Sequence, residues 1–391
     1  MEHILFIEPS TLWYIFGGVV FFCFLVQCYY WLIPYRKLAT AFRKNPGVAA
    51  EHSFPPVSVL LITKDAGQLL AQNLPSILEQ DYPDFEVIIV DEHMKGEDED
   101  TIKLLQAKYP NLYRTFLPDS ARYISRRRLG VSVGLKAAKH EWVVLTDPSC
   151  KPNSRMWLRN LMGRITPETD IVLGYSNYEK RAGFWATRIV LDGMFHAMRS
   201  LGAALRGNPY MGMATNMAVR KEYYLASRIL SMYVHLKRGE DDLFVNAFGN
   251  KKNTQVALGK ESVVSVQYPP YKRLWLMDKI NYLVTGALYK GWASWCNAWE
   301  TLTAFCFKVF SIIGIVYAGM QEQWYWVGGF ALLFLVRYLL VGWVLSSTAK
   351  AVGEKLSVSV WWYDFLRTLW AVQLKLAYWF RTKSDYYKKT L

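Results

Sequence analysis

Apolar residues gather in three long runs near the two ends of the chain. The runs cover residues 11–33, 301–320 and 324–346. A helix needs about 20 apolar residues to cross a bilayer, so we predict three membrane-spanning helices. Between the first two runs, short apolar stretches alternate with segments in which apolar residues have the spacing of a helix. That pattern predicts an α/β domain over residues 56–272.

The segments that flank these runs are basic. Residues 34–55 follow the first run with Arg36, Lys37, Arg43 and Lys44 and precede the domain, and residues 381–391 form a second basic segment. Positive charge stays on the cytoplasmic side of a membrane. We therefore predict an integral protein of the plasma (inner) membrane, with residues 1–10 outside and both the domain and the C-terminal tail in the cytoplasm.

Two further segments mix tryptophans with charged side chains. Residues 273–300 and 356–380 have this composition, which predicts amphipathic helices lying in the membrane interface. Trp292, Trp295 and Trp299 would then close a site against the membrane, or serve as simple anchors. Lys308 and Arg337 lie inside predicted spans, where a charge is costly unless it faces protein or reaches the interface.

The formal net charge of +14 raises the question of whether the protein binds nucleic acid. The basic residues flank membrane segments and form no stripe with interleaved aromatics, so membrane lipids are the expected partner and nucleic acid is not. The five cysteines have no metal-binding spacing and no paired framework, which indicates reduced thiols.

Acidic residues follow three predicted strands of the domain. The strands cover residues 57–62, 86–90 and 142–145, with further strands at 112–116 and 170–174 and helices at 68–80, 100–108 and 125–139. Asp65, Asp91 and Asp147 come just after three of them. Each alone is typical of a turn or helix cap. In a parallel sheet these ends share one edge, where carboxylates suit the N–H and hydroxyl donors of a nucleoside.

No glycine pattern for a dinucleotide and no Walker loop follows the first strand. Arg126, Arg127 and Arg128 form a basic triplet that suits a diphosphate; the alternatives are a solvated helix face or a membrane-surface patch. Asp241 and Asp242 could be helix-capping acids, or one could act as a base.

Four stretches together resemble membrane-bound family-2 glycosyltransferases, the group that includes cellulose, chitin and hyaluronan synthases. They are VSVLLITKDAGQLLAQNLPSILEQDYPDFEVIIVDE, SRRRLGVSVGLKAAKHEWVVLTDPSC, YMGMATNMAVRKE and GEDDLFVNA, within about residues 56–290. The resemblance implies a GT-A fold, a nucleotide-sugar donor and a divalent metal, Mg²⁺ or Mn²⁺.

The resemblance also assigns roles to residues. Thr63, Asp65 and Asp91 would face the uridine, and Asp147 would lie near the ribose and the metal. Asp241 would be the general base. The loop with Gly212, Asn216 and Arg220 would border the donor or acceptor.

The chain departs from the family at two motifs. Ser149 stands where the second aspartate of Asp-x-Asp is expected, and a neutral hydroxyl is a weak ligand for a hard dication. The Gln-x-x-Arg-Trp motif is also changed: Lys272, Arg273 and Trp275 have its chemistry at another spacing, and a later register would place Met277 and Asn281 there.

Two interpretations follow from this pattern. In the first, arginines and lysines neutralise the diphosphate, and the protein transfers a sugar, most simply from a UDP-sugar, to a lipid-linked or other membrane-proximal glycan acceptor in single additions. In the second, the chain is an inactive relative that scaffolds a membrane protein partner.

Overall fold

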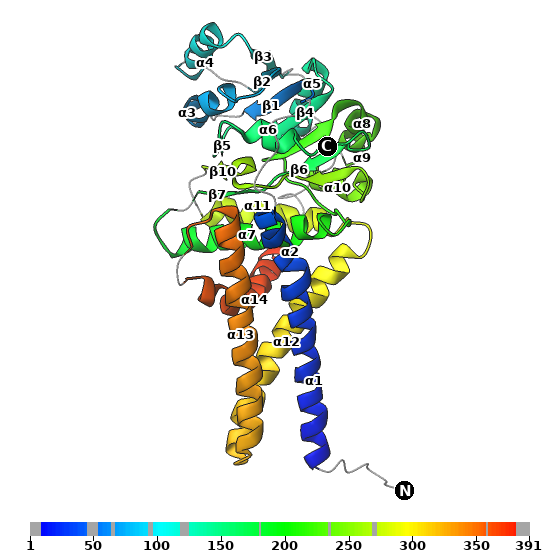
Figure 1. The fold of residues 1–391 in the computed structure, drawn as a ribbon, viewed down its shortest axis with the longest axis vertical. Helices are drawn as coiled ribbons and strands as arrows, with labels where there is room; N and C mark the ends of the chain where they lie inside the picture. The colour runs from blue at the N-terminus through cyan, green and yellow to red at the C-terminus, as the bar shows by residue number, and fades with distance from the viewer. Residues whose placement is uncertain are drawn as a thin grey trace.

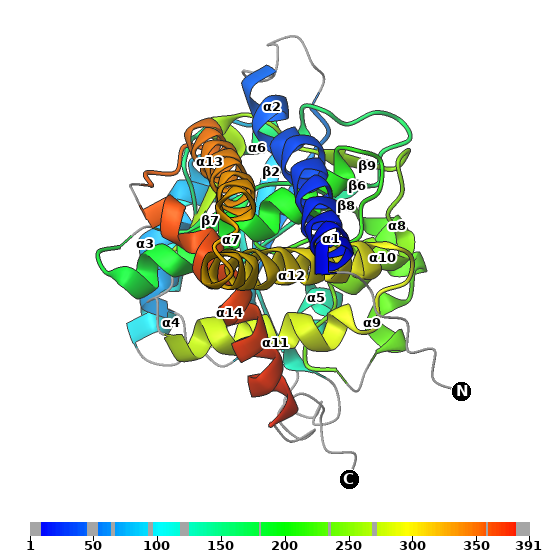
Figure 2. The same ribbon diagram turned by 90° about the horizontal axis from the view of Figure 1, so that it is seen from below.

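The computed structural model describes residues 9–44, 54–63, 67–92, 97–117, 125–179, 181–233, 236–267, 272–356 and 359–380. An α/β domain lies above a group of long helices (Figure 1). Viewed from below, α11 (Lys272–Gly286) and α14 (Ser359–Trp379) run across the underside of the domain beside the long helices (Figure 2). The predicted tail at 381–391 and most of the segment at 1–10 lie outside the described residues.

The main sheet has seven strands with the order β3-β2-β1-β4-β8-β6-β9. The first four strands pair in parallel, as the alternating pattern predicts. Strand β8 is antiparallel to both of its neighbours, and β6 and β9 are parallel. The strands are β1 (Val57–Thr63), β2 (Phe85–Asp91), β3 (Leu112–Phe116), β4 (Trp142–Thr146), β6 (Ile171–Leu173), β8 (Met217–Arg220) and β9 (Thr254–Val256).

Helices cover both faces of this sheet, so the central strands are buried on both sides. They are α3 (Gly67–Leu78), α4 (Glu97–Lys108), α5 (Arg126–Ala137) and α6 (Trp157–Met162). On β1, Leu60 packs in one apolar core with residues of α5, and Val59 packs in a second core with residues of α3. A Cβ atom at Gly134 would lie 2.1 Å from the Leu60 side chain. Glycine at this position therefore lets α5 pack closely on β1.

A second, three-stranded sheet and several short helices lie between the main sheet and the long helices. Its order is β5 (Cys150–Pro152), β10 (Val264–Val266) and β7 (Ser176–Tyr178). The other elements of the domain are α7 (Phe184–Ala204), α8 (Lys221–Ala226), α9 (Ile229–Met232), α10 (Asp242–Phe248), η2 (Lys260–Ser262) and α11 (Lys272–Gly286).

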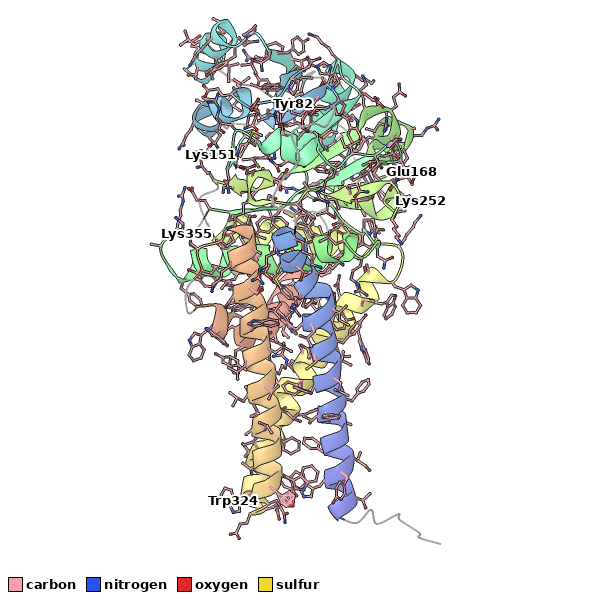
Figure 3. The ribbon with its side chains drawn as sticks, viewed as in Figure 1. Tyr82, Lys151, Glu168, Lys252, Trp324 and Lys355 are labelled. Atoms are coloured by element: carbon pink, nitrogen blue, oxygen red, sulfur yellow. The ribbon has the colours of Figure 1, made fainter. Side chains whose placement is uncertain are left out.

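Three segments of the described chain are long and apolar enough to cross a membrane, as predicted. They comprise α1 (Pro9–Tyr30) with η1 (Trp31–Tyr35) and α2 (Arg36–Lys44), then α12 (Ala293–Met320), then α13 (Trp324–Val352). Trp324 marks the end far from the domain, whereas Lys151, Lys252 and Lys355 lie on the domain or at its junction with the helices (Figure 3).

The first helix does not end at Ile33, where the apolar run and Pro34 predict a boundary. Proline lacks an N–H and disrupts the ordinary helical bonding pattern. The chain absorbs it in the π-helical turn η1 and continues into α2. Arg43 of α2 then donates to the carbonyl and the hydroxyl of Ser347 on α13, at 3.2 and 2.8 Å. Part of the predicted basic linker is thus a helix packed on the bundle.

Two of the charged residues of α14 (Ser359–Trp379), Asp364 and Arg367, are buried and not turned to the headgroups as we expected. Asp364 accepts from Arg337 of α13 at 2.6 Å and pairs with Lys308 of α12 at 3.2 Å. Arg367 donates to Glu300 of α12 at 2.7 Å. The outward face carries apolar residues instead: Trp362, Phe365, Leu369, Val372, Leu376 and Trp379. Lys308 and Arg337 therefore face protein, one of the two arrangements that the sequence allowed.

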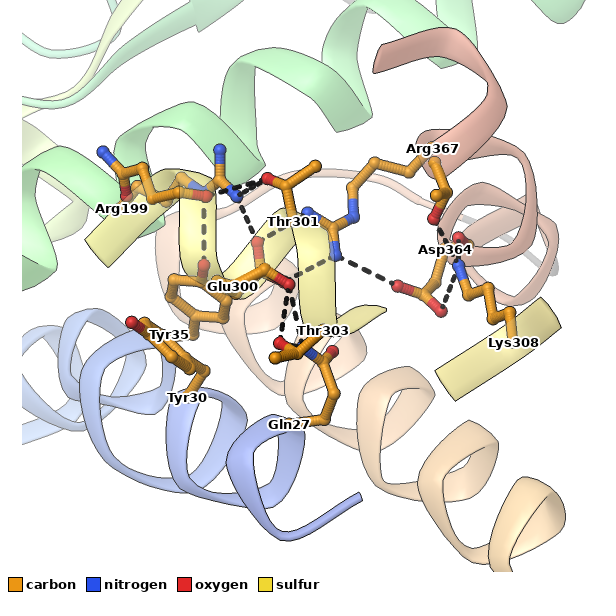
Figure 4. A network of polar contacts seen from close by, with 12 residues as sticks. Gln27, Tyr30, Tyr35, Arg199, Glu300, Thr301, Thr303, Lys308, Asp364 and Arg367 are labelled. Atoms are coloured by element: carbon orange, nitrogen blue, oxygen red, sulfur yellow. Dashed lines mark hydrogen bonds and ion pairs between the residues drawn. The ribbon is translucent and has the colours of Figure 1, made fainter. Parts of the chain in front are cut away.

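This network joins the helices to the domain (Figure 4). Arg199 of α7 pairs with Glu300 and donates to the Tyr35 hydroxyl at 3.1 Å. Gln27 of α1 donates to the carbonyl of Glu300 and the hydroxyl of Thr303, each at 3.0 Å. Removing one partner from such a network leaves the other charge buried without compensation.

We predict that Asp364→Asn lowers the stability of the protein by about 3 kcal/mol or more, because it removes the carboxylate shared by Lys308 and Arg337. The thermal unfolding midpoint in detergent measures the change. Lys375→Gln on the same helix is the control, since Lys375 is exposed. Equal midpoints for the two variants would show that the network contributes little.

Candidate active site

Three strand ends bring polar residues to one edge of the main sheet. Thr63 pairs with Asp91 in the parallel register of β1 and β2. Asp147 follows Thr146 of β4, which pairs with Leu61 of β1. Parallel strands end at the same edge, so these residues share it. Asp65 lies outside the described residues.

Asp91 is neutralised by an arginine that the sequence did not single out. Arg114 of β3 donates to the Asp91 carboxylate at 2.5 Å from Nη2 and 3.2 Å from Nε. The register sets Arg114 beside Ile89, two residues before Asp91, so both side chains lie on one face of the sheet. Thr63 is fully buried, and its hydroxyl donates to the Val90 carbonyl at 3.4 Å.

Asp147 is both a turn residue and part of a charged cluster. Its Oδ1 accepts from the backbone N–H and the hydroxyl of Ser149, at 3.1 and 2.8 Å. This is the side-chain-to-backbone bond of an aspartate turn. Its Oδ2 lies 3.4 Å from the guanidinium of Arg127. Ser149 is buried, and its hydroxyl is engaged by Asp147.

Arg127 joins the sheet edge to the acidic segment before α10. This residue lies in the first turn of α5, and its guanidinium contacts both Asp147 and Glu240. Burial would raise the pKa of the Glu240 carboxyl, but Arg127 outweighs it and the pKa is lowered. The result is one cation held between two carboxylates from distant parts of the chain.

Asp241 comes next and caps α10. Its Oδ1 accepts from the Asp242 N–H at 2.9 Å, and its Oδ2 accepts from the Ala214 N–H at 2.8 Å. Burial and the neighbouring Glu240 raise the pKa of Asp241. Asp241 thus combines the capping role with a place near Arg127, whose pKa its negative charge helps to raise. The bond to Ala214 also ties it to the loop before β8.

Asp242 is more deeply enclosed. Its Oδ1 accepts from the Leu243 N–H at 2.8 Å, and its Oδ2 accepts from the hydroxyls of Tyr289, at 2.8 Å, and Thr285. Burial and the negative charge of Asp241 raise its pKa to about 7. Near neutral pH this carboxyl is therefore divided between its two protonation states.

Two other predicted site residues, Arg128 and Asn216, have contacts within the protein that account for their positions. Arg128 is almost fully buried and donates to the carbonyl of Arg238 at 3.0 Å, which supports the chain leading to Glu240. Asn216 binds the indole of Trp157 and the carbonyls of Tyr175 and Ser262.

Trp275 of α11 donates to Asp192 at 3.3 Å, and its ring contacts the Arg188 guanidinium. The side chains of Lys272, Arg273 and Met277 lie outside the described parts of the chain. Arg220 bonds to Asp170 and Glu141 beside the start of β4, away from the strand ends that carry Asp91 and Asp147.

The side chains of the described residues do not form a metal site that the protein alone could hold. No three of their histidine, cysteine, aspartate or glutamate side chains are grouped so that they could hold an ion. Asp147 is bonded to Ser149 and faces the guanidinium of Arg127, so a cation already occupies one side of it. Hard dications prefer several oxygen ligands, and this arrangement supplies one carboxylate.

The fold is that of a mixed α/β glycosyltransferase, with a mainly parallel sheet and three long apolar helices. A mannosyltransferase from Pyrobaculum calidifontis, PcManGT, solved in complex with GDP-Man and Mn²⁺, aligns over 91% of this chain and 99% of its own with a TM-score of 0.54 and 17% identity. That likeness bears on the fold alone. Residues 1–349 of S. aureus TarS align over 81% of this chain and 92% of their own, with 18% identity and a TM-score of 0.42, too low to add to the fold argument.

The family model described as glycosyl transferase family 21 matches residues 19–226, more than half of the 391 residues. The chain belongs to glycosyl transferase family 21. The match includes Thr63, Asp91 and Asp147 and ends before Asp241.

We predict that the stability of the protein falls as pH rises from about 4 to about 7, and that Asp242→Asn reduces this fall. The folded-state pKa of Asp242, about 7, lies above the ordinary pKa of an aspartate, 3.8. Protonated Asp242 therefore contributes its full stabilisation at pH values below 3.8, the ordinary pKa of an aspartate. This contribution is lost as the pH rises through the folded-state pKa of about 7. The full difference is on the order of 4 kcal/mol.

Thermal midpoints of both proteins at pH 5 and pH 8 measure this effect. Asp100→Asn is the control, because that side chain is 75% exposed. If Asp242→Asn and the native protein lose equal stability over this range, Asp242 does not titrate as described.

Proposed function

We propose that this protein transfers a sugar from a UDP-sugar to a lipid-linked or other membrane-proximal glycan acceptor, on a GT-A fold related to family 2. The observation that carries the proposal is the cluster in which Arg127 contacts Asp147 and Glu240, with Asp241 close enough to interact with the charge of Arg127. It lies where the sheet edge with Thr63 and Asp91 meets the start of α10.

The donor would lie along the sheet edge. Thr63, Asp65 and Asp91 are the proposed uridine contacts, and Asp147 is the proposed ribose contact. The diphosphate is neutralised by Arg127, together with Lys272 and Arg273 near the start of α11. Guanidinium groups suit this task because they match phosphate geometry. No step of the reaction is assigned to a metal.

Asp241 is the proposed general base. The acceptor hydroxyl attacks the anomeric carbon and gives its proton to the Asp241 carboxylate, while the bond between that carbon and the diphosphate oxygen breaks. Burial and Glu240 raise the pKa of Asp241, which makes its carboxylate a stronger proton acceptor. Asp242 is less suited, since a backbone N–H and two hydroxyls already bind its oxygens.

The three apolar helices support a place in the membrane. The basic residues of α2, directly after the first of them, favour the cytoplasm for the domain and the outside for the N-terminus. The acceptor would then be reached at the cytoplasmic surface, next to α7 and α11.

One observation favours the second candidate, an inactive scaffold. Ser149 and Arg127 together bind both oxygens of Asp147, so the protein itself satisfies a carboxylate that a donor complex would use. A measurement of nucleotide binding distinguishes the transferase from the inactive scaffold.

We predict that UDP binds the purified full-length protein and that Mn²⁺ changes its Kd by roughly threefold or less, because arginine and lysine neutralise the diphosphate. Isothermal titration calorimetry with and without Mn²⁺ measures both values, with inosine as the control for nonspecific nucleoside binding. A gain of more than about tenfold with Mn²⁺ would reject the metal-independent site. No binding of any nucleoside diphosphate would favour the scaffold.

We also predict that Asp241→Asn lowers sugar transfer by about 10²- to 10⁴-fold while UDP affinity stays within about twofold, because the change removes the proton acceptor and leaves the donor contacts in place. Release of UDP in membranes that contain the native acceptor measures the rate. Asp242→Asn is the matched comparison. If it abolishes transfer and Asp241→Asn does not, the two roles are reversed.

A further inference from the structure

A cavity of about 530 Å³ lies beside the junction of the domain and the long helices. Its described lining comes from the end of α1, from η1, from the end of α7 and the loop after it, from α10, and from the start of α12. The residues used in the argument are Tyr29, Arg199, Arg206, Asn246, Lys290 and Trp292. None of the residues in the Arg127 cluster lines it, so it is separate from the proposed donor site.

The cavity lies beside the domain end of the apolar helices, the depth at which lipid headgroups are expected if these helices span the membrane. The apolar helix α1 ends at Tyr30, and the basic helix α2 follows it after η1. Tyr29 is 46% exposed and Trp292 is 83% exposed at the mouth. Tyrosine and tryptophan gather at this depth of a bilayer, with their rings between chains and water. Figure 1 shows that α1 and α12 both approach the domain at one end.

The lining is basic. Arg199, Arg206 and Lys290 contribute to it, and no acidic side chain does so among the described residues. Arg199 is paired with Glu300, but no ion pair to an acid is found for Arg206 or Lys290 in the described chain. Arg206 donates to the Tyr29 hydroxyl at 3.2 Å, which holds its guanidinium at the mouth.

The buried network behind the cavity adds to this charge. Four basic residues (Arg199, Lys308, Arg337 and Arg367) share two carboxylates, those of Glu300 and Asp364. An excess of positive charge thus lies next to an acid-free cavity at the membrane surface. An anion on an amphiphile complements both features, since guanidinium and ammonium groups bind phosphate and the aromatic rim suits the lipid backbone.

We propose that this cavity binds the phosphate headgroup of an anionic membrane lipid, with Arg206 and Lys290 as its phosphate-binding side chains. A lipid here would contact parts of the chain that meet near the acidic cluster. Asn246 lies one turn after Asp242 on α10; it donates to the carbonyl of Tyr210 at 3.1 Å and accepts from the Lys290 N–H at 2.7 Å. A lipid in the cavity would thus contact both α10 and the segment that leads into α12. This role goes beyond sugar transfer and does not depend on it.

Titration of the full-length protein in detergent with dioctanoyl phosphatidylglycerol, followed by native mass spectrometry, tests the site. We expect Arg206→Gln with Lys290→Gln to weaken binding by about tenfold or more, since each basic residue contributes at a lipid surface. Lys136→Gln with Lys151→Gln removes the same charge from exposed positions elsewhere on the domain and should leave binding unchanged.

A second variant tests the cavity by its volume. Ala203→Trp places a large ring in the lining without a change of charge, and it should also weaken lipid binding. Unchanged thermal midpoints and UDP affinity show that the variants are folded and that the donor site is separate.

Three outcomes would overturn the proposal. One is equal binding by the cavity variants and the native protein. Another is equal affinity for dioctanoyl phosphatidylcholine, which would show that the anionic charge is not recognised. The third is displacement of the lipid by millimolar inorganic phosphate, which would identify a site for soluble anions.

Discussion

The contact of Arg127 with Asp147 and Glu240 holds the candidate active site together. Carboxylates that are close and buried repel one another and lose hydration, so without a cation they would take up protons. Arg127 supplies that cation from the first turn of α5. The place of α5 depends in turn on Gly134, which allows the helix to approach Leu60 of β1. The close packing of α5 on β1 thus determines where the Arg127 cation lies at the edge of the sheet.

The same principle operates between the domain and the long helices. Glu300 of α12 pairs with Arg199 of α7 and Arg367 of α14, and Asp364 pairs with Lys308 and Arg337. Charges that are costly in hydrocarbon become contacts that fix how elements meet, because each has a partner within reach. In this network four basic side chains share two carboxylates. The resulting excess of positive charge beside the cavity favours the binding of an anion there.

The sheet and helices were largely predictable because they follow from local patterns. The runs at 57–62 and 142–145 became β1 and β4, and the helix at 125–139 became α5. Strand β8 lies in a segment that we assigned to a loop at the donor or acceptor, with a turn and strand as the alternative; its antiparallel pairing with β4 and β6 joins distant segments and was not predicted. The charges of α14 were assigned to the wrong side for a similar reason. A helix with a polar face can turn it to water or to a partner, and only the neighbouring helices decide.

What the sequence determined by itself was a set of strand-end acids, a basic triplet and three apolar runs, because these depend on residue type and spacing along the chain. Tertiary structure alone decided which arginine serves the site. Arg127 contacts Asp147 and Glu240. Arg128, one position later, instead donates hydrogen bonds to the carbonyls of Leu230 and Arg238. Neighbours on a helix are about 100° apart, so adjacent side chains meet different partners. The partner of Asp91, Arg114, likewise came from strand register, a relation between segments that no single stretch of sequence contains.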